Sequence, residues 1–330
     1  MKYTIAPQIG IYSDHSFWLE GQLLPLREKH LHVKSKESVW KHMRRMYRVY
    51  TAHKTGKQQL RIRCGENEWQ VTTNNYGFFQ LNGKQIKEGE RITYYMNGGE
   101  QPVSIFSFED EFYYADPKKL GVISDIDDTI LHTNATNVVK KLRQTVGKTV
   151  HKRKNVIHMN DLYQQLQYLG AEFYYVSNSE MNLYYLIHHF LENKNFPLGP
   201  IYLKPLRRLN HLLYKRSKKV AKYLHKIEKI RKLLDLYPDK PYLFIGDSGQ
   251  QDAYVYTHLA REYPEQVKGV YIRDIGKRID FKEYERYRKQ LEQLGIPFEV
   301  FDSARDIIGT LTKCASVWQQ DLLDEGKGND

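Results

Sequence analysis

The feature that most constrains the fold is an alternation of two patterns that runs from about residue 118 to about residue 301. Short apolar runs, typical of buried strands, alternate with stretches whose apolar residues recur at helical spacing. The apolar runs are 121–127, 172–179, 199–204, 241–249, 267–275 and 297–301, and the helical stretches are 161–170, 182–193, 225–237 and 280–295. This alternation predicts an α/β fold with a doubly wound parallel sheet, in which a ligand site lies at the carboxyl ends of the strands.

The residues before this alternation follow a different pattern. Short runs of alternating apolar and polar residues are separated by turns such as Asn74-Asn75-Tyr76-Gly77, which is typical of antiparallel β-structure. These runs are 59–64, 68–73, 78–82 and 91–97. The segment 38–53 has helical spacing instead. We therefore expect three parts. Residues 1–117 form a smaller β-rich domain that contains one helix, residues 118–320 form an α/β domain, and residues 321–330 form a polar tail.

Composition excludes several classes of protein. The apolar runs are too short to span a membrane, and the mean hydropathy is negative. The first ten residues, MKYTIAPQIG, lack the charged and then apolar layout of a signal peptide. Cys64 and Cys314 stand alone, without the spacing of a disulfide framework or a zinc site. We expect a cytoplasmic protein.

The net charge of +12 is concentrated in two segments. Residues 129–160 hold seven Lys or Arg and no acid, and residues 204–226 hold nine Lys or Arg and no acid. The remainder of the chain carries about −4. A mildly acidic body with two basic segments indicates an anionic partner at a defined place.

Three of the predicted strands end in side chains suited to phosphoryl transfer. The first runs directly into Asp125 and Asp127, a later strand ends in Ser177 and Asn178, and another ends in Asp247 with Asp252 shortly after. Each has an ordinary alternative: an acidic turn, a strand-end hydroxyl or a helix cap. Clustered carboxylates are electrostatically costly unless a cation or a reaction needs them. The occurrence of all three strand ends in order favours a functional site.

This arrangement resembles the haloacid-dehalogenase-like phosphohydrolases from about Gly121 to Phe301. Four segments are similar, more narrowly, to the catalytic domain of the actin-patch-associated phosphatidate phosphatase family. They are GVISDIDDTILHTNATN, FYYVSNSEMNLYYLIHHFLENKNFPLGPIYLK, HKIEKIRKLL and YLFIGDSGQQDAYVY. That family has a β-rich domain before the catalytic one, and the run VTTNNYGFF resembles its turn motif. The resemblance implies a haloacid-dehalogenase-like fold with a minimal cap.

The resemblance also implies roles for individual residues. Asp125 would be the nucleophile that forms an aspartyl-phosphate, and Asp127 would be the general acid and base. Thr129 would orient the loop, while Ser177 and Asn178 would bind the phosphoryl oxygens.

The implied cofactor is Mg²⁺, held by Asp125, Asp247 and the backbone carbonyl of Asp127, with Asp252 as a further or alternative ligand. A lysine that offsets phosphoryl charge would be Lys226, with Lys222 as the rival. Lys204, Arg207 and Arg208, in the second basic segment, are predicted to contact the substrate.

One position departs from the family. Pro-Trp commonly follows the serine-bearing strand end, whereas this chain has Glu180-Met181. An acid at the entrance and the loss of an aromatic wall change what the leaving group touches, but leave the phosphoryl chemistry in place.

The second basic segment indicates the partner. Between Leu206 and Leu224, apolar residues recur at helical spacing among Lys and Arg, as in a helix lying on an anionic membrane, although a helix docked on the sheet with a solvated basic face is equally consistent. We expect hydrolysis of an anionic lipid such as phosphatidate, with peripheral membrane contact. A phosphatase of nucleic-acid ends or soluble phosphomonoesters ranks lower, since no nucleic-acid fold is recognised. A non-catalytic lipid-binding module would not need the acid pair. The oligomeric state stays open.

Overall fold

The computed structural model describes residues 3–13, 16–25, 55–84, 86, 90–105, 112–126, 129, 154–180, 184–204, 220–249, 251–276 and 280–325. The chain divides into two compact units. Unit 1 comprises 1–115, 180–185 and 203–216, and unit 2 comprises 116–179, 186–202 and 217–330. The predicted helix at 38–53, Asp127, Arg207, Arg208 and most of both basic segments lie outside the described residues.

Unit 1 is built from two β-sheets. The first has the order β5-β2-β1-β7, with β8 also paired to β1, and the second has the order β4-β3-β6. The strands are β1 (Thr4–Tyr12), β2 (Ser16–Leu24), β3 (Gln59–Cys64), β4 (Asn67–Thr72), β5 (Phe78–Lys84), β6 (Ile92–Met96), β7 (Ser104–Ile105) and β8 (Phe112–Tyr114). Phe17 and Leu19 of the first sheet share one buried core with Leu60 and Ile62 of the second. The predicted β-rich region is confirmed as two sheets enclosing a common core.

The predicted turn at 74–77 shows why its residue types are needed. The Asn74 side chain accepts hydrogen bonds from the backbone N–H groups of Tyr76 and Phe78, at 2.8 and 3.1 Å. Gly77 has φ of 79°, and a Cβ there would lie 2.0 Å from the carbonyl oxygen of Leu23. Only glycine fits this conformation and this close approach.

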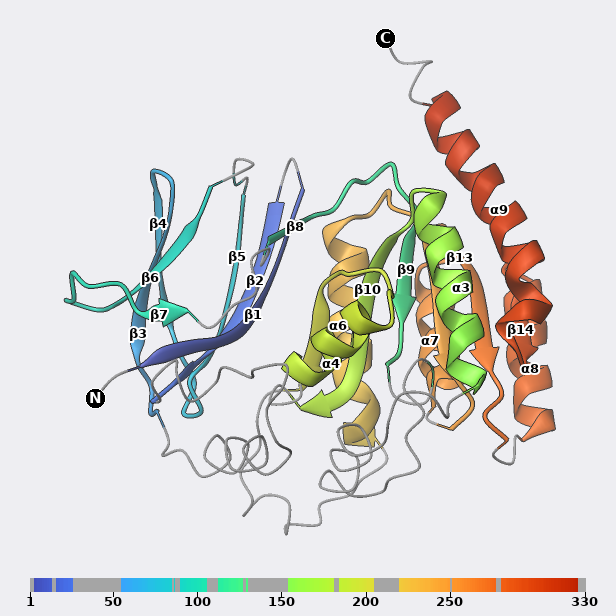
Figure 1. The fold of residues 1–330 in the computed structure, drawn as a ribbon, viewed down its shortest axis with the longest axis horizontal. Coiled ribbons are helices and arrows are strands. Elements are labelled where there is room, and N and C mark those ends of the chain that lie inside the picture. Colours follow the sequence, from blue (N-terminus) through green and yellow to red (C-terminus); the bar gives the residue numbers. More distant parts are fainter. Residues whose placement is uncertain are drawn as a thin grey trace. The chain divides into compact units, whose positions relative to one another are not determined.

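Unit 2 is an α/β structure around a six-stranded sheet, drawn in Figure 1 with helices on both faces. The strand order is β11-β10-β9-β12-β13-β14, and β9, β10, β12, β13 and β14 pair in parallel. The strands are β9 (Gly121–Ser124), β10 (Glu172–Glu180), β11 (Ile201–Lys204), β12 (Tyr242–Asp247), β13 (Val267–Arg273) and β14 (Phe298–Phe301). The order reverses between β9 and β12, the point at which open α/β sheets bind ligands. The predicted α/β class is confirmed.

The helices of unit 2 are α3 (Lys154–Tyr168), α4 (Tyr184–Asn193), α6 (Val220–Leu236), α7 (Asp252–Glu262), α8 (Phe281–Glu292) and α9 (Ala304–Glu325). Sequence reasoning did not predict α7 or α9. The signal for α9 was present, because Ile307, Leu311 and Ala315 are buried at four-residue spacing, and α9 packs on α3 and β14. This helix continues into the expected polar tail.

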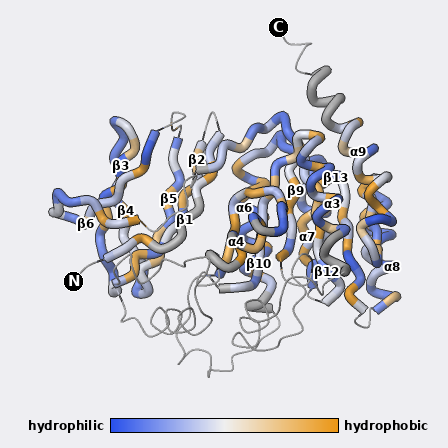
Figure 2. Tube along the Cα trace, in the orientation of Figure 1, coloured by the Kyte–Doolittle hydropathy of each residue, from blue (hydrophilic) through white to orange (hydrophobic). Residues whose placement is uncertain are grey.

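Burial follows the layers of the sheet. Every residue of β9 and β12 is buried, as expected for central strands covered on both faces. Figure 2 shows hydrophobic residues gathered along the sheet and hydrophilic residues on α8. Over the described part of the chain, no helix combines the length and apolarity needed to cross a membrane.

A buried lysine ties together the amino-terminal ends of the central strands. The Nζ atom of Lys240 donates to the carbonyls of Asp116 and Lys119, at 2.5 and 2.8 Å, and to Glu172 at 2.8 Å. The Lys240 side chain is fully buried, whereas Glu172 is partly exposed. Burial lowers the pKa of Lys240, against the opposing effect of Glu172. Lys240 therefore fixes the segment that leads into β9.

Replacing Lys240 with methionine should destabilise unit 2, because two carbonyls and a carboxylate would lose their shared donor. We expect a loss of about 2–4 kcal/mol in the free energy of unfolding, measured by denaturant titration. The matched control is Lys119→Met, at a lysine whose side chain is 45% exposed and pairs only loosely with Asp116. Equal losses in both variants would contradict this role for Lys240.

Candidate active site

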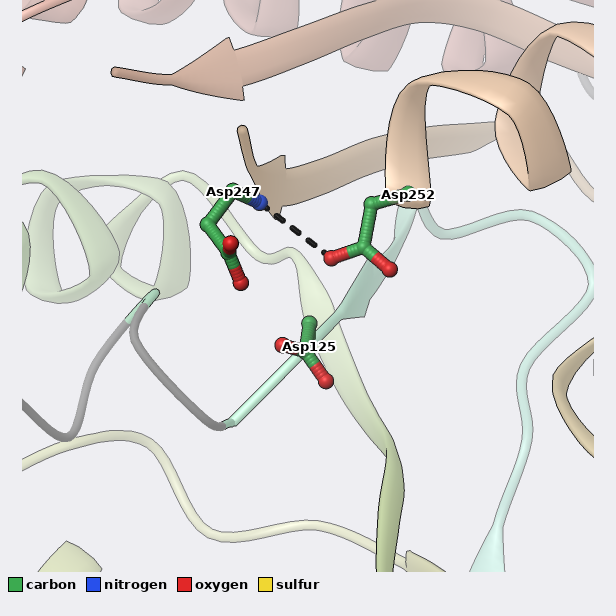
Figure 3. Close-up of side chains that lie close together, drawn as sticks. All are labelled: Asp125, Asp247 and Asp252. Carbon is green, nitrogen blue, oxygen red and sulfur yellow. Dashed lines mark hydrogen bonds between the residues drawn. The ribbon is translucent and has the colours of Figure 1, made fainter. Parts of the chain in front are cut away.

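The carboxyl edge of the unit 2 sheet gathers three acids and one lysine from separate elements. Asp125 directly follows β9, Asp247 ends β12, and Asp252 begins α7. Lys226 lies on α6. Figure 3 shows the three carboxyl groups converging. Since β9 and β12 are adjacent parallel strands, residues at their carboxyl ends must lie close together.

The four side chains form a tightly connected cluster. The Nζ atom of Lys226 lies 2.7 Å from Oδ1 of Asp125 and 2.5 Å from Oδ1 of Asp252. One carboxylate oxygen from each of Asp125, Asp247 and Asp252 lies within 4.8 Å of the others. All four side chains are at most 1% exposed. We call these four residues the acid–lysine cluster.

Glycines and backbone donors hold the carboxylates in place. A Cβ on Gly246 would lie 2.6 Å from the Cβ of Asp252, so β12 and α7 approach this closely only because residue 246 has no side chain. The Asp252 carboxylate accepts a hydrogen bond from the Asp247 backbone N–H at 3.2 Å, drawn in Figure 3. The N–H of Gly249 donates to Asp247 Oδ1 at 2.5 Å.

Thr129 and Arg273 extend the cluster. The Thr129 hydroxyl donates to Asp247 Oδ2 at 3.4 Å, and the role of Thr129 in orienting the loop stays a prediction. Arg273, the last residue of β13, donates to the Thr129 carbonyl at 3.3 Å and is buried. Sequence reasoning missed Arg273, although a charged residue ending an apolar strand was a usable signal.

A second missed contact supports the strand that carries Asp125. The Ser124 hydroxyl donates to the Asp125 carbonyl at 2.7 Å and lies 2.7 Å from the Tyr163 hydroxyl of α3. Both side chains are buried. This pair fixes the backbone where the strand ends.

Two further predicted site residues, Ser177 and Asn178, lie on β10 at the carboxyl end of the same sheet. Ser177 is buried in β10, and its hydroxyl accepts a hydrogen bond from the Ser179 N–H at 2.9 Å. Tyr175 pairs with Ser124, so Ser177 and Asn178 extend past the end of β9 on the same edge. Lys204 ends β11, and β10 lies between β11 and β9 in the sheet.

Of the two candidate lysines, Lys226 is the one that the structure places against Asp125. Lys222 lies one turn earlier on α6, and its side chain is outside the described residues. Among these two lysines, the structure therefore describes side-chain contacts for Lys226 only. Its Nζ atom lies 2.7 Å from Asp125 and 2.5 Å from Asp252.

Electrostatics show an excess of negative charge in the acid–lysine cluster. Burial alone would lower the pKa of Lys226, but the charges of Asp125 and Asp252 outweigh it and hold that pKa above its usual range. Burial and the neighbouring Asp252 raise the pKa of Asp247 to about 7. Three buried carboxylates and one ammonium leave a charge that a divalent cation would neutralise. Their oxygen donors are the type that Mg²⁺ prefers, so these residues fit the ion.

The fold and this cluster define a class of protein: an α/β domain with an acidic site at the carboxyl edge of a parallel sheet. Residues 120–274 match the family described as phosphatidate phosphatase APP1, catalytic domain. This match agrees with the resemblance that the sequence motifs indicated. The match includes every member of the acid–lysine cluster.

Two curated relatives extend the comparison. Phosphatidate phosphatase APP1 of Saccharomyces cerevisiae is 32% identical over 163 residues, covering 48% of this chain and 27% of the yeast protein. An uncharacterized protein of Schizosaccharomyces pombe is 26% identical over 238 residues, covering 70% of this chain and 38% of that protein. The chain thus spans between a quarter and two fifths of the length of these relatives.

Among solved structures, a carbohydrate acetylesterase from Xanthomonas citri aligns over 92% of this chain and 72% of its own, with 8% identity and a TM-score of 0.29. A similarity this low supports no statement about fold or function.

The raised pKa of Asp247 makes the stability of the metal-free protein depend on pH. The native carboxyl holds its proton up to about pH 7, whereas the unfolded chain releases it near its ordinary value of 3.8. The free energy of unfolding should therefore fall as pH rises through this window, by about 2–3 kcal/mol between pH 5 and pH 8.

Denaturant titrations in chelator at several pH values measure this dependence. In Asp247→Asn the free energy of unfolding should fall less over this pH range, because residue 247 no longer titrates. Histidines titrate in both proteins, so comparing the two cancels their contribution. The same pH slope in both proteins would contradict the raised pKa of Asp247.

Proposed function

We propose that the chain is a Mg²⁺-dependent phosphomonoester hydrolase of the haloacid-dehalogenase-like type, acting on phosphatidate or a related anionic lipid through an aspartyl-phosphate. The observation that carries this proposal is the acid–lysine cluster, in which Lys226 bridges Asp125 and Asp252 beside Asp247. Such a buried cluster is costly to assemble unless it serves a cation and an anionic substrate. The match of residues 120–274 to the phosphatidate phosphatase APP1 family and the similarity to the yeast enzyme support the choice of substrate.

The proposed reaction has two displacements at phosphorus. In the first, a carboxylate oxygen of Asp125 forms a bond to phosphorus while the bond to the leaving alkoxide breaks, and Asp127 gives that alkoxide a proton. In the second, Asp127 takes a proton from water, whose oxygen attacks phosphorus and releases phosphate from Asp125. Asp125 and Asp127 are thereby regenerated.

The other residues of the site bind and orient. Lys226, already held at 2.7 Å from Asp125, offsets charge on the phosphoryl group next to the nucleophile. Ser177 and Asn178 would bind phosphoryl oxygens from the end of β10. Asp125, Asp247 and Asp252 would hold Mg²⁺, which supplies charge neutralisation at the phosphoryl oxygens when bound.

Two alternatives keep a lower rank. A phosphatase of nucleic-acid ends or soluble phosphomonoesters would use the same acid–lysine cluster with a different leaving-group surface. A non-catalytic lipid-binding module is disfavoured because Asp125 and Asp127 would then have no task. The acid-free segment 204–226, with nine Lys or Arg, supports an anionic surface as the partner and peripheral membrane contact.

The nucleophile can be tested directly. Asp125→Asn should lower phosphate release by several orders of magnitude, because it removes the attacking carboxylate while Lys226 keeps its contact with Asp252. The assay compares phosphatidate, a small soluble phosphomonoester and an end-phosphorylated oligonucleotide with Mg²⁺ present. Phosphatidate should be the best substrate.

The control is Asp161→Asn, at an aspartate on α3 whose side chain is 52% exposed. It should retain wild-type turnover. An Asp125→Asn variant with a tenth of wild-type activity on the best substrate would rule out the nucleophile assigned here.

The metal can be tested separately. Phosphate release should stop in excess chelator and return with Mg²⁺, and Asp247→Ala should raise the Mg²⁺ concentration needed for half-maximal activity, because it removes one of three converging carboxylates. Calorimetric titration of Mg²⁺ into both proteins gives the affinity without turnover. Full activity in excess chelator would remove the metal from the mechanism.

A further inference from the structure

Helices α6 and α7 each carry a tyrosine close in sequence to a residue of the acid–lysine cluster. Tyr223 lies three residues before Lys226 on α6, so the two side chains share a helix face one turn apart. Tyr254 lies two residues after Asp252 in the first turn of α7. The same pair of helices thus contributes both the Lys226–Asp252 ion pair and these two rings.

The two rings contact each other. Their centroids lie 6.0 Å apart. The Tyr254 ring also stacks on His258, with centroids 6.2 Å apart and an interplanar angle of 7°. Tyr254 is 43% exposed and Tyr223 is partly buried. We call Tyr223 and Tyr254 the aromatic rim.

The direction in which α6 runs determines where Tyr223 lies relative to the carboxyl ends of the strands. Lys226 meets Asp125 at the carboxyl edge of the sheet, and Tyr223 is closer to the start of α6. Side chains on a helix tilt toward its amino terminus, which carries the Tyr223 ring further past the strand ends. Tyr223 therefore lies on the outer side of the acid–lysine cluster, and Tyr254 contacts it from the exposed face of α7.

We propose that the aromatic rim binds the non-phosphate part of the substrate, contacting the glyceryl ester region of a lipid phosphate whose phosphorus sits at Asp125. The proposal rests on the proposed function and names a specificity surface for it. A tyrosine ring presents an apolar face with a polar tip, which suits the boundary between headgroup and acyl chain. The rim provides aromatic surface in a chain that has Glu180-Met181 where the related family commonly has Pro-Trp.

The test compares two substrates in each variant. We expect Tyr223→Ala and Tyr254→Ala to lower the ratio of kcat/KM for phosphatidate in mixed micelles to kcat/KM for a small soluble phosphomonoester, by about tenfold for each ring removed. The ratio cancels any disturbance of the phosphoryl site that affects both substrates. Tyr223→Phe keeps the ring and should keep the ratio.

The matched control is Tyr168→Ala, at a tyrosine that is 91% exposed at the end of α3, near the opposite edge of the sheet. It should leave the ratio at the wild-type value. An unchanged ratio in both rim variants, or an equal fall in Tyr168→Ala, would overturn the proposal. A selective loss on an end-phosphorylated oligonucleotide instead would replace the lipid by a nucleobase stacked on the rim.

A binding measurement separates this proposal from the proposed function. Sedimentation with phosphatidylcholine vesicles containing phosphatidate requires no turnover, and it can use the Asp125→Asn background. If the wild type hydrolyses none of the substrates, the proposed function fails, while weaker sedimentation of Tyr254→Ala than of Tyr168→Ala still supports the rim. Equal sedimentation of both variants would overturn it.

Discussion

The ion pairs of Lys226 are the interaction on which the site depends. A fully buried ammonium contacts the carboxylates of Asp125 and Asp252 and so links β9, α6 and α7 at one point. Removing charges from water is expensive, and breaking such a buried pair leaves an uncompensated charge. Asp247 adds a further carboxylate, which one lysine cannot neutralise. The site therefore carries more negative than positive charge, and a divalent cation would balance the excess.

The sheet makes this arrangement possible. Parallel pairing of β9 with β12 brings Asp125 and Asp247 to one edge, and the missing side chain at Gly246 lets Asp252 approach from α7. At the amino-terminal ends of the strands, Lys240 donates hydrogen bonds to carbonyls of the segment that leads into β9. A buried lysine thus lies at each end of β9. Lys226 contacts Asp125 at the carboxyl end, and Lys240 binds backbone carbonyls before the amino-terminal end.

Much of this could be predicted from the sequence, because period and strand-end chemistry are local signals. The strand at 59–64 and the turn at 74–77 were predicted with the right bounds, and parallel strands alone brought Asp125 and Asp247 to one edge. Contacts that depend on tertiary packing could not be predicted. The family resemblance named Lys226 ahead of Lys222, but its contact with Asp252 depends on the packing of α6 beside α7. The contacts of Arg273 and of Tyr223 with Tyr254 depend on packing in the same way.

The proposed mechanism requires that Asp125 becomes covalently phosphorylated during turnover. The most direct measurement is to quench the reaction during turnover, reduce the protein with borohydride, and identify the altered residue by mass spectrometry of its peptides. Because borohydride converts an aspartyl-phosphate into homoserine, we expect homoserine at position 125, formed only with substrate present. Homoserine at another aspartate, or none at all while phosphate is being released, would contradict it.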